Sequence, residues 1–225
     1  MLKTIIFDFN GIIIDDETLH FAAMRESVAG FGIDLRKEEY WAKYLPLDDM
    51  RCLEAICRDH SIHLTEAERA RVLEHKSENY NQALGNGFQL FPGAAEFIRT
   101  AAVRYPLVLA SGARRDEIES TLVSAGLRRY FVLIVAAEDF VRGKPHPESF
   151  LLALERLNMV ARSAPIQPAE CLVVEDSVEG VRGARAAGMV CLAVTNSYPR
   201  EMLRAADKIV TSLAEVQLDS LQMLF

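Results

Sequence analysis

Residues 4–15 read TIIFDFNGIIID, in which an apolar run ends at Asp8 and an Asn-Gly pair leads into a second apolar run. Asn-Gly between two apolar runs is a strong signal for a two-residue β-hairpin, because both residues tolerate positive φ angles. Alternatively, the first run is a buried parallel strand, and Asp8 stands at its carboxyl end, where α/β proteins bind ligands. The remainder of the sequence bears on this choice.

Further short apolar runs resemble strands: YPLVLAS (105–111), YFVLIVA (130–136), ECLVVED (170–176), MVCLAV (189–194) and DKIVTS (207–212). Helix-like stretches precede all of these, among them GAAEFIRTAAVR (93–104), DEIESTLVSAGL (116–127), PESFLLALERLN (147–158) and VEGVRGARAAG (178–188). Strands that alternate with helices indicate a parallel sheet covered on both faces. The sequence therefore predicts a doubly wound α/β core.

Residues 16–90 interrupt this alternation with a pattern that is helical throughout. Apolar residues recur three and four positions apart in ETLHFAAMRESVAGF (17–31), RCLEAICRDH (51–60) and EAERARVLEHKSENYNQAL (66–84), and no strand fits there. The Pro-Gly break in FPGAAEF (91–97) restarts the alternation. We therefore predict a core of residues 1–15 and 91–225, with an all-helical domain of residues 16–90 inserted after the first strand.

The composition is that of an ordinary soluble protein. Acidic residues outnumber basic ones, 32 to 25, and no basic run is interleaved with aromatic residues, which argues against nucleic-acid and membrane partners. The four cysteines form no CxxC pair and are typical of buried, reduced thiols. Neither a secretory signal pattern nor an apolar run of membrane-spanning length occurs, so we expect a cytoplasmic protein.

Polar side chains stand at or beyond the ends of four predicted strands. Asp8 follows TIIF, Ser111 follows LVLA, Glu175 and Asp176 follow CLVV, and Lys144 lies in the loop beyond FVLIVA. Each alone has an ordinary explanation as a turn residue, a helix cap or a solvated charge. Because the carboxyl ends of parallel strands meet at one edge of a sheet, we expect all of them to converge on one crevice.

This set of groups suits phosphoryl transfer. Several carboxylate oxygens make a site for Mg²⁺. The cation and Lys144 would neutralise phosphoryl charge, and Ser111 would donate a hydrogen bond to a phosphoryl oxygen. Asp8 can attack phosphorus and form an aspartyl-phosphate. The strand ends therefore predict a Mg²⁺-dependent phosphoryl-transfer site.

The stretches FDFNGIIID, LASG, GKPHPESF and VVEDSVEGVRGARAAG resemble the four ordered motifs of the haloacid dehalogenase superfamily. The resemblance covers essentially the whole chain, and the helical insert stands in the position of the small cap domain of that superfamily. The chain looks most similar to the β-phosphoglucomutase-like branch, which contains phosphatases of small metabolites and phosphosugar mutases. The resemblance implies a Rossmann-like α/β core with a helical cap.

The resemblance also implies a role for the matching residues. Asp8 would be the nucleophile, and Ser111 and Lys144 would hold the phosphate. The protein's ligands to Mg²⁺ would be Asp8, Glu175, Asp176 and the main-chain carbonyl of Asn10. Further substrate contacts are expected at Gly11, Gly112, His20 and Lys76. On this interpretation Asn10-Gly11 is a loop below the phosphate, and a short hairpin at residues 12–15 stays compatible with it.

Asn10 departs from the family pattern, in which a second aspartate protonates the leaving oxygen and later activates the attacking water. An amide can do neither, although it can hydrogen-bond and its main-chain carbonyl can bind metal. Three accounts stay open: the change was introduced to trap a ligand, the natural protein works without the acid–base residue, or its task is not ordinary hydrolysis. Asp15, Asp16 and His20 are the nearest substitutes, but each is more typical of a hinge or cap.

The predicted cap carries YLPLDDMR (44–51) where the family's phosphohexomutases have a glycine-containing loop with an arginine for a second phosphate. Asp48 and Asp49 stand where positive charge would be needed, which argues against a bisphosphate intermediate. We therefore expect a Mg²⁺-dependent phosphatase of a small phosphorylated metabolite, impaired by Asn10, that is a monomer or weak homodimer. A phosphosugar mutase and a catalytically silent phosphate-ester binding protein are the alternatives.

Overall fold

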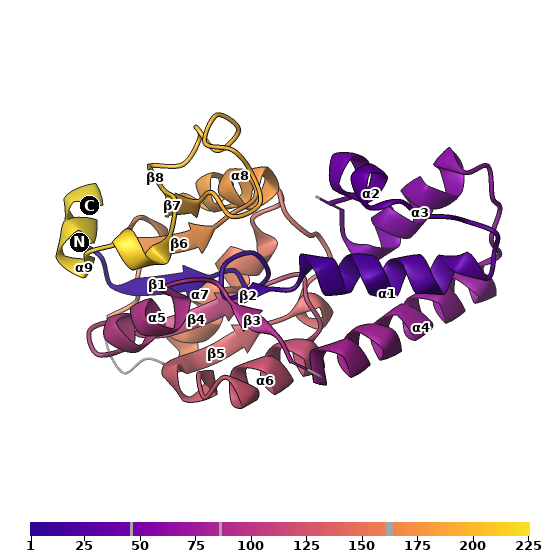
Figure 1. The fold of residues 1–225 in the computed structure, drawn as a ribbon. Helices are drawn as coiled ribbons and strands as arrows, with labels where there is room; N and C mark the ends of the chain where they lie inside the picture. Colours follow the sequence, from indigo (N-terminus) through magenta and orange to yellow (C-terminus); the bar gives the residue numbers. More distant parts are fainter. Residues whose placement is uncertain (46, 86, 161–163) are drawn as a thin grey trace. The chain divides into compact units, whose positions relative to one another are not determined.

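The computed structural model describes residues 1–45, 47–85, 87–160 and 164–225, so Pro46 of the YLPLDDMR stretch lies outside the described residues. The chain divides into two compact units (Figure 1). The α/β unit contains Met1–Asp15 and Leu90–Phe225, and the helical unit contains Asp16–Gln89. Within the described ranges, no helix is both long and apolar enough to cross a bilayer.

A six-stranded sheet forms the centre of the α/β unit, with its strands in the order β5-β4-β1-β6-β7-β8 (Figure 1). The strands are β1 (Thr4–Phe7), β4 (Leu107–Ala110), β5 (Phe131–Val135), β6 (Cys171–Glu175), β7 (Val190–Val194) and β8 (Lys208–Val210). All neighbouring pairs are parallel. The chain proceeds outward from β1 to β4 and β5, then returns to the other side of β1 at β6. This reversal is the point at which open α/β sheets bind ligands.

The helices of the α/β unit are α5 (Ala94–Ala102), α6 (Arg115–Ser124), α7 (Glu148–Val160), α8 (Val178–Ala186) and α9 (Leu218–Leu221). Short 3-10 helices are η1 (Arg128–Tyr130), η2 (Ala137–Asp139), η3 (Pro168–Glu170), η4 (Leu213–Glu215) and η5 (Gln222–Leu224). Helix α7 packs on β4 and β5, and α8 packs on β6 and β7. The predicted doubly wound α/β fold is confirmed.

The two faces of β1 enter different parts of the core, because successive side chains of a strand point to opposite faces. Ile6 packs with Val108, Phe150 and Val181 in the cluster beneath α7 and α8. Phe7 meets Phe97 of α5 and Phe131 of β5 edge-on, at ring-centroid distances of 5.9 and 5.8 Å. Burial on both faces explains why these strands read as continuous apolar runs.

Two details differ from the sequence-based expectations. No helix precedes β8, because residues 195–207, all of them described, form turns and bends. In addition, β2 (Ile14–Asp15) pairs with β3 (Gln89–Leu90) in a separate two-stranded sheet, whereas no strand was expected within residues 16–90. A two-residue strand is too short to give a recognisable alternation of apolar and polar residues.

The helical unit contains α1 (Glu17–Ala29), α2 (Lys37–Lys43), α3 (Asp49–Asp59) and α4 (Glu66–Gly85). Helix α1 packs along α4. Local capping fixes two helix starts: the Asp48 carboxylate accepts a hydrogen bond from the Arg51 amide at 2.9 Å, and Thr65 and Glu68 form a reciprocal capping box before α4. Asp48 therefore has a structural task at the start of α3.

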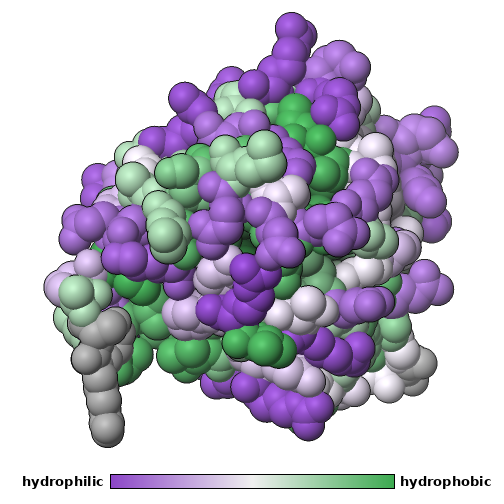
Figure 2. All heavy atoms as spheres, turned by 90° about the vertical axis from the view of Figure 1, so that its left-hand side faces the viewer, coloured by the Kyte–Doolittle hydropathy of each residue, from purple (hydrophilic) through white to green (hydrophobic). Residues whose placement is uncertain are grey.

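Composition and burial agree with the expectations for an ordinary globular chain. On the face drawn in Figure 2, hydrophilic side chains are interspersed with smaller hydrophobic areas. The four cysteines, Cys52, Cys57, Cys171 and Cys191, are free and buried, as the sequence predicted.

Replacing Phe7 by alanine tests the packing beneath the central strand. Phe7 is fully buried, so Phe7→Ala should lower the free energy of unfolding by about 3–5 kcal/mol through lost burial and a residual cavity. Urea denaturation of the full chain measures this loss. Val103→Ala is the control, because Val103 is 85% exposed and its truncation should change stability by about 0.5 kcal/mol or less. Equal losses for the two variants would contradict the packing described here.

Candidate active site

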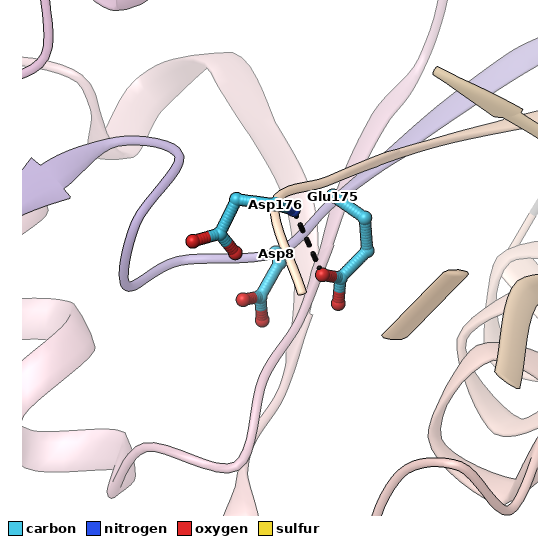
Figure 3. Close-up of side chains that lie close together, drawn as sticks. All are labelled: Asp8, Glu175 and Asp176. Atoms are coloured by element: carbon cyan, nitrogen blue, oxygen red, sulfur yellow. Dashed lines mark hydrogen bonds between the residues drawn. The ribbon is translucent and has the colours of Figure 1, made fainter. Parts of the chain in front are cut away.

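Three carboxylates meet at the carboxyl ends of β1 and β6. The Asp8 amide donates a hydrogen bond to the Val174 carbonyl at 3.0 Å, which sets Asp8 beside Glu175 and Asp176. Each acidic residue offers a carboxylate oxygen within 4.8 Å of the others, and all three side chains are buried. Figure 3 shows the three carboxyl groups close together. The parallel register thus produces the predicted convergence of acidic groups.

Lys144 lies between two of these carboxylates. Its ammonium is 2.6 Å from Asp8 Oδ1 and 2.5 Å from Glu175 Oε1. Burial alone would lower the pKa of Lys144, but the two carboxylates reverse the shift, and the pKa is raised. The lysine is therefore held as a cation, as its predicted role requires.

The cluster carries an excess of negative charge. Three carboxylates and one ammonium leave a formal charge of −2 when all four are ionised. Burial raises the pKa of Asp8 to about 6, opposed by Lys144 and reinforced by Glu175. Burial, followed by repulsion from Glu175 and Asp8, also raises the pKa of Asp176. A divalent cation would cancel the excess charge, and an all-oxygen donor set suits Mg²⁺.

Glu175 is held more firmly than the other two carboxylates. Its Oε2 accepts hydrogen bonds from the Asp176 amide, the Ser177 amide and the Ser177 hydroxyl, at 2.9, 3.0 and 2.9 Å. A Cβ at Gly180 would lie 1.9 Å from this carboxyl group, so only glycine lets α8 begin against it. With Oε2 occupied by three donors, Oε1, which faces the Lys144 ammonium at 2.5 Å, is the Glu175 oxygen left to meet a metal ion.

The loop after β1 answers the question raised by the Asn-Gly pair. Gly11 adopts a φ of +74°, and its amide donates a hydrogen bond to the Ile14 carbonyl at 3.1 Å. A Cβ at Gly11 would lie 2.0 Å from Asp176 Oδ2, so the backbone passes directly against this carboxylate. Asn10-Gly11 therefore forms a tight loop beside the acidic cluster, and the following β2 pairs with β3 rather than with β1.

Ser111 stands at the neighbouring strand end. The pairing of Phe7 with Leu109 sets Asp8 level with Ala110, one residue before Ser111. Ser111 is buried, and its hydroxyl oxygen accepts a hydrogen bond from the Ala113 amide at 3.2 Å. Gly112 borders open space where a side chain would begin. These positions agree with the predicted edge of the crevice.

His20 and Lys76 belong to the helical unit, where they take part in a buried polar network. The Lys76 ammonium is 2.8 Å from Asp49 Oδ2 and 2.7 Å from His20 Nδ1. His20 Nε2 lies 3.2 Å from Asp16 Oδ2, which also accepts a hydrogen bond from the Tyr80 hydroxyl. Because Nδ1 faces an ammonium donor, the neutral imidazole with its proton on Nε2 satisfies both contacts. The Lys76 side chain is only 1% exposed, so Lys76 is a buried member of this network.

Two residues that sequence reasoning missed also contact the site. The Asn196 side-chain amide donates a hydrogen bond to the Gly11 carbonyl at 2.6 Å, and the Ser197 hydroxyl donates one to Asp176 Oδ2. Both lie in the loop that follows β7, outside every recognised motif. The one available signal was their position beyond the carboxyl end of the next parallel strand.

Comparison with known proteins agrees with this geometry. Residues 2–188 match the haloacid dehalogenase-like hydrolase family. The fructose-1-phosphate phosphatase YqaB of Escherichia coli is 30% identical over 185 residues, which cover 82% of this chain and 92% of that protein.

Two solved structures are similar over nearly the whole chain. CbbY from Rhodobacter sphaeroides, solved as an aspartate-to-asparagine mutant in complex with xylulose-(1,5)bisphosphate, superposes with a TM-score of 0.83 and 26% identity, and 96% of each chain is covered. β-Phosphoglucomutase from Clostridium difficile gives a TM-score of 0.86 at 24% identity and covers 100% of this chain and 97% of that one, which is a likeness of fold.

The raised pKa of Asp8 predicts a pH-dependent metal affinity. A proton and a cation compete for the same carboxylate, so affinity should be greatest above pH 6 and fall as the pH drops through about 6. One competing proton weakens binding about tenfold for each further pH unit. Titration of the full chain with Mn²⁺, followed by electron paramagnetic resonance between pH 5 and pH 8, measures the effect. An affinity that stays constant over this range would contradict it.

The network around Lys76 predicts that two single substitutions lower the free energy of unfolding by different amounts. Asp49→Ala leaves the buried ammonium without its carboxylate, and an unpaired buried charge is strongly destabilising, by about 3 kcal/mol or more. Lys76→Met removes the buried charge, and the half-exposed Asp49 carboxylate can then be solvated. The loss of unfolding free energy should therefore be smaller for Lys76→Met than for Asp49→Ala. Urea denaturation of both variants compares them. A greater loss for Lys76→Met would show that the ion pair does not control this site.

Proposed function

The chain belongs to the haloacid dehalogenase-like hydrolase family, and on that basis we propose that it is a Mg²⁺-dependent phosphatase acting on a small phosphorylated metabolite through an aspartyl-phosphate on Asp8. The observation that carries the proposal is the buried cluster of three carboxylates around Lys144, with a formal excess of two negative charges. A divalent cation would balance this charge, and a phosphoryl group would bring it further oxygen ligands.

Mg²⁺ would be held by Asp8, Asp176, the main-chain carbonyl of Asn10 and the remaining oxygen of Glu175. When bound, the ion would offset charge on the phosphoryl oxygens. In this arrangement Asp8 keeps one carboxylate oxygen for the ion and one for nucleophilic attack. The ion would also offset the burial and the repulsion from Glu175 that together raise the pKa of Asp8, which favours the ionised nucleophile.

The reaction assigns separate tasks to the remaining residues. Lys144 would pair with a phosphoryl oxygen, and Ser111 would donate a hydrogen bond to another. The Asp8 oxygen then forms a bond to phosphorus as the bond to the leaving oxygen breaks. Water subsequently attacks the aspartyl-phosphate, which releases phosphate and regenerates the Asp8 carboxylate.

Asn10 limits both steps, because its amide can neither give a proton to the leaving oxygen nor take one from water. General acid–base catalysis typically contributes about 10² to 10⁴ in rate, or roughly 3–5 kcal/mol of barrier. The hydrolysis rate of alkyl phosphates should be reduced most, since their leaving groups need the proton. Aryl phosphates, whose leaving groups are stable as anions, should suffer least.

The substrate class is a small phosphorylated metabolite with one phosphate. Asp48 caps α3 and Asp49 pairs with Lys76, so this stretch carries acidic residues where the family's phosphohexomutases have an arginine for a second phosphate. That disfavours a phosphosugar mutase, which requires a bisphosphate. Known relatives act on or bind phosphorylated sugars, which supports a sugar phosphate as the first candidate.

The helical unit would serve as a cap that excludes water from the reacting phosphate. His20 and Lys76 are the predicted substrate contacts from this unit. Their present partners are within the helical unit itself, so a substrate anion would compete with Asp49 for the Lys76 ammonium. A cytoplasmic location and a monomeric or weakly dimeric state stay predictions.

A catalytically silent phosphate-ester binding protein is the second candidate, and Asn10 is the observation that favours it. An amide keeps hydrogen-bonding capacity while losing the transferable proton. Ligand binding would then survive where turnover does not.

Restoring the acidic group at residue 10 tests the proposed function. Asn10→Asp should raise the hydrolysis of alkyl phosphates by about 10² or more, and that of p-nitrophenyl phosphate by less. Phosphate release from sugar phosphates, nucleotides and p-nitrophenyl phosphate, each with Mg²⁺, measures this.

Asp8→Ala in the Asn10→Asp background is the matched control, and it should abolish turnover, as should a chelator. Activity that persists without Asp8 would refute the aspartyl-phosphate. Saturable ligand binding without phosphate release in both the unchanged chain and Asn10→Asp would favour the silent binding protein.

A further inference from the structure

The loop after β7 reaches the acidic cluster from the side opposite to Ser111. The sheet order makes β7 the neighbour of β6, so the chain beyond Val194 emerges next to Asp176. The Thr195 amide donates a hydrogen bond to the Val210 carbonyl of β8 at 3.0 Å, which ties the start of this loop to the sheet. Asn196 and Ser197 follow directly from that anchored point.

Ser197 acts on the carboxylate of Asp176. The serine hydroxyl donates a hydrogen bond to Asp176 Oδ2. The same oxygen would be only 2.0 Å from a Cβ at Gly11, so it packs directly against the glycine backbone. The carboxylate is therefore held between the Ser197 hydroxyl on one side and the Gly11 backbone on the other. Its orientation is set before any ligand arrives.

Asn196 acts on the loop that carries Asn10. Its side-chain amide donates a hydrogen bond to the Gly11 carbonyl at 2.6 Å. The Gly11 amide is fixed in turn by the Ile14 carbonyl at 3.1 Å. Both main-chain groups of Gly11 are thus tied down, and the adjoining peptide, which includes the Asn10 carbonyl, is restricted with them.

We propose that Asn196 and Ser197 are positioning residues for the metal half of the site, where they orient two proposed ligands of Mg²⁺, the Asp176 carboxylate and the Asn10 carbonyl. The inference rests on the proposed function, because it concerns the same cation. Partners of this kind raise metal affinity without touching the ion, since they remove the freedom that the ligands would otherwise lose on binding.

A purely structural tie between loops predicts a different result. A structural tie would change the stability of the fold and leave the metal affinity of the folded protein unchanged. The two interpretations are separated by measuring Mn²⁺ affinity and thermal unfolding on the same full-length variants. Metal affinity also does not depend on whether Asn10 permits turnover.

Substitutions of matched shape isolate the donated hydrogen bonds. Ser197→Thr keeps the hydroxyl. Ser197→Val has nearly the same shape as Ser197→Thr but lacks the hydroxyl. Asn196→Asp keeps the shape but replaces the donor by a carboxylate. We expect Ser197→Val and Asn196→Asp to weaken Mn²⁺ binding about 10–100-fold, and Ser197→Thr to retain affinity close to the unchanged chain.

Two further variants control for general effects on the fold. Asn158→Ala removes an asparagine whose side-chain amide donates a hydrogen bond to the Ile166 carbonyl at 2.9 Å and accepts one from the Ile166 amide at 2.8 Å. Ser220→Ala removes an α9 hydroxyl that donates a hydrogen bond to the Gln217 carbonyl and accepts one from the Lys208 ammonium. Asn158→Ala should lower the unfolding temperature, Ser220→Ala should change it little, and both should keep the Mn²⁺ affinity of the unchanged chain.

The titrations distinguish failure of this inference from failure of the proposed function. If the unchanged chain binds Mn²⁺ and Asp176→Ala does not, but Ser197→Val and Asn196→Asp bind within twofold of the unchanged chain, the positioning role is refuted and the metal site stands. If the unchanged chain binds no Mn²⁺ at neutral pH, the metal-dependent function and the positioning role fall together. Weakened binding by Ser197→Val with rescue by Ser197→Thr supports the inference.

Discussion

The site depends on one buried ammonium held between two carboxylates. Lys144 bridges Asp8 and Glu175 at 2.6 and 2.5 Å, and without it three buried acidic groups would lie together without a cationic partner. Unpaired buried charges are expensive, so the lysine makes the acidic cluster compatible with a folded protein. It offsets only part of the negative charge. The remaining negative charge is what a divalent cation would balance in the proposed function, so the same cluster of charges bears on both stability and function.

Backbone geometry determines how closely the groups around this lysine approach. Gly180 lets α8 start against the Glu175 carboxyl group, and Gly11 lets the loop after β1 pass against Asp176. Three donors then fix Oε2 of Glu175. Glu175 therefore serves mainly as a rigid support for its neighbours, while Asp8 and Asp176 keep more of their capacity for ligands.

Sequence patterns located the principal charged residues because strand ends are easy to read. Asp8, Lys144 and Asp176 follow buried apolar runs, and parallel pairing brings such positions together. Asn196 and Ser197 were not predicted, because they lie in a loop with no periodic pattern and contact residues that are distant in the sequence. Lys76 was named as a substrate contact, but its burial was not predicted. It occupies the buried stripe of α4 between Val72 and Tyr80, and its charge concealed the four-residue spacing that indicates burial.

The turn at Gly11 also affects the chemical lifetime of Asn10. An asparagine followed by glycine deamidates when the glycine nitrogen attacks the side-chain carbonyl and expels ammonia. Here that nitrogen donates its hydrogen to the Ile14 carbonyl, and the Asn196 amide holds the other side of the glycine. The folded loop thus keeps the attacking atom engaged elsewhere. Slow ageing of this amide into a carboxylic acid should consequently be faster in chains that have lost, or not yet acquired, their native turn.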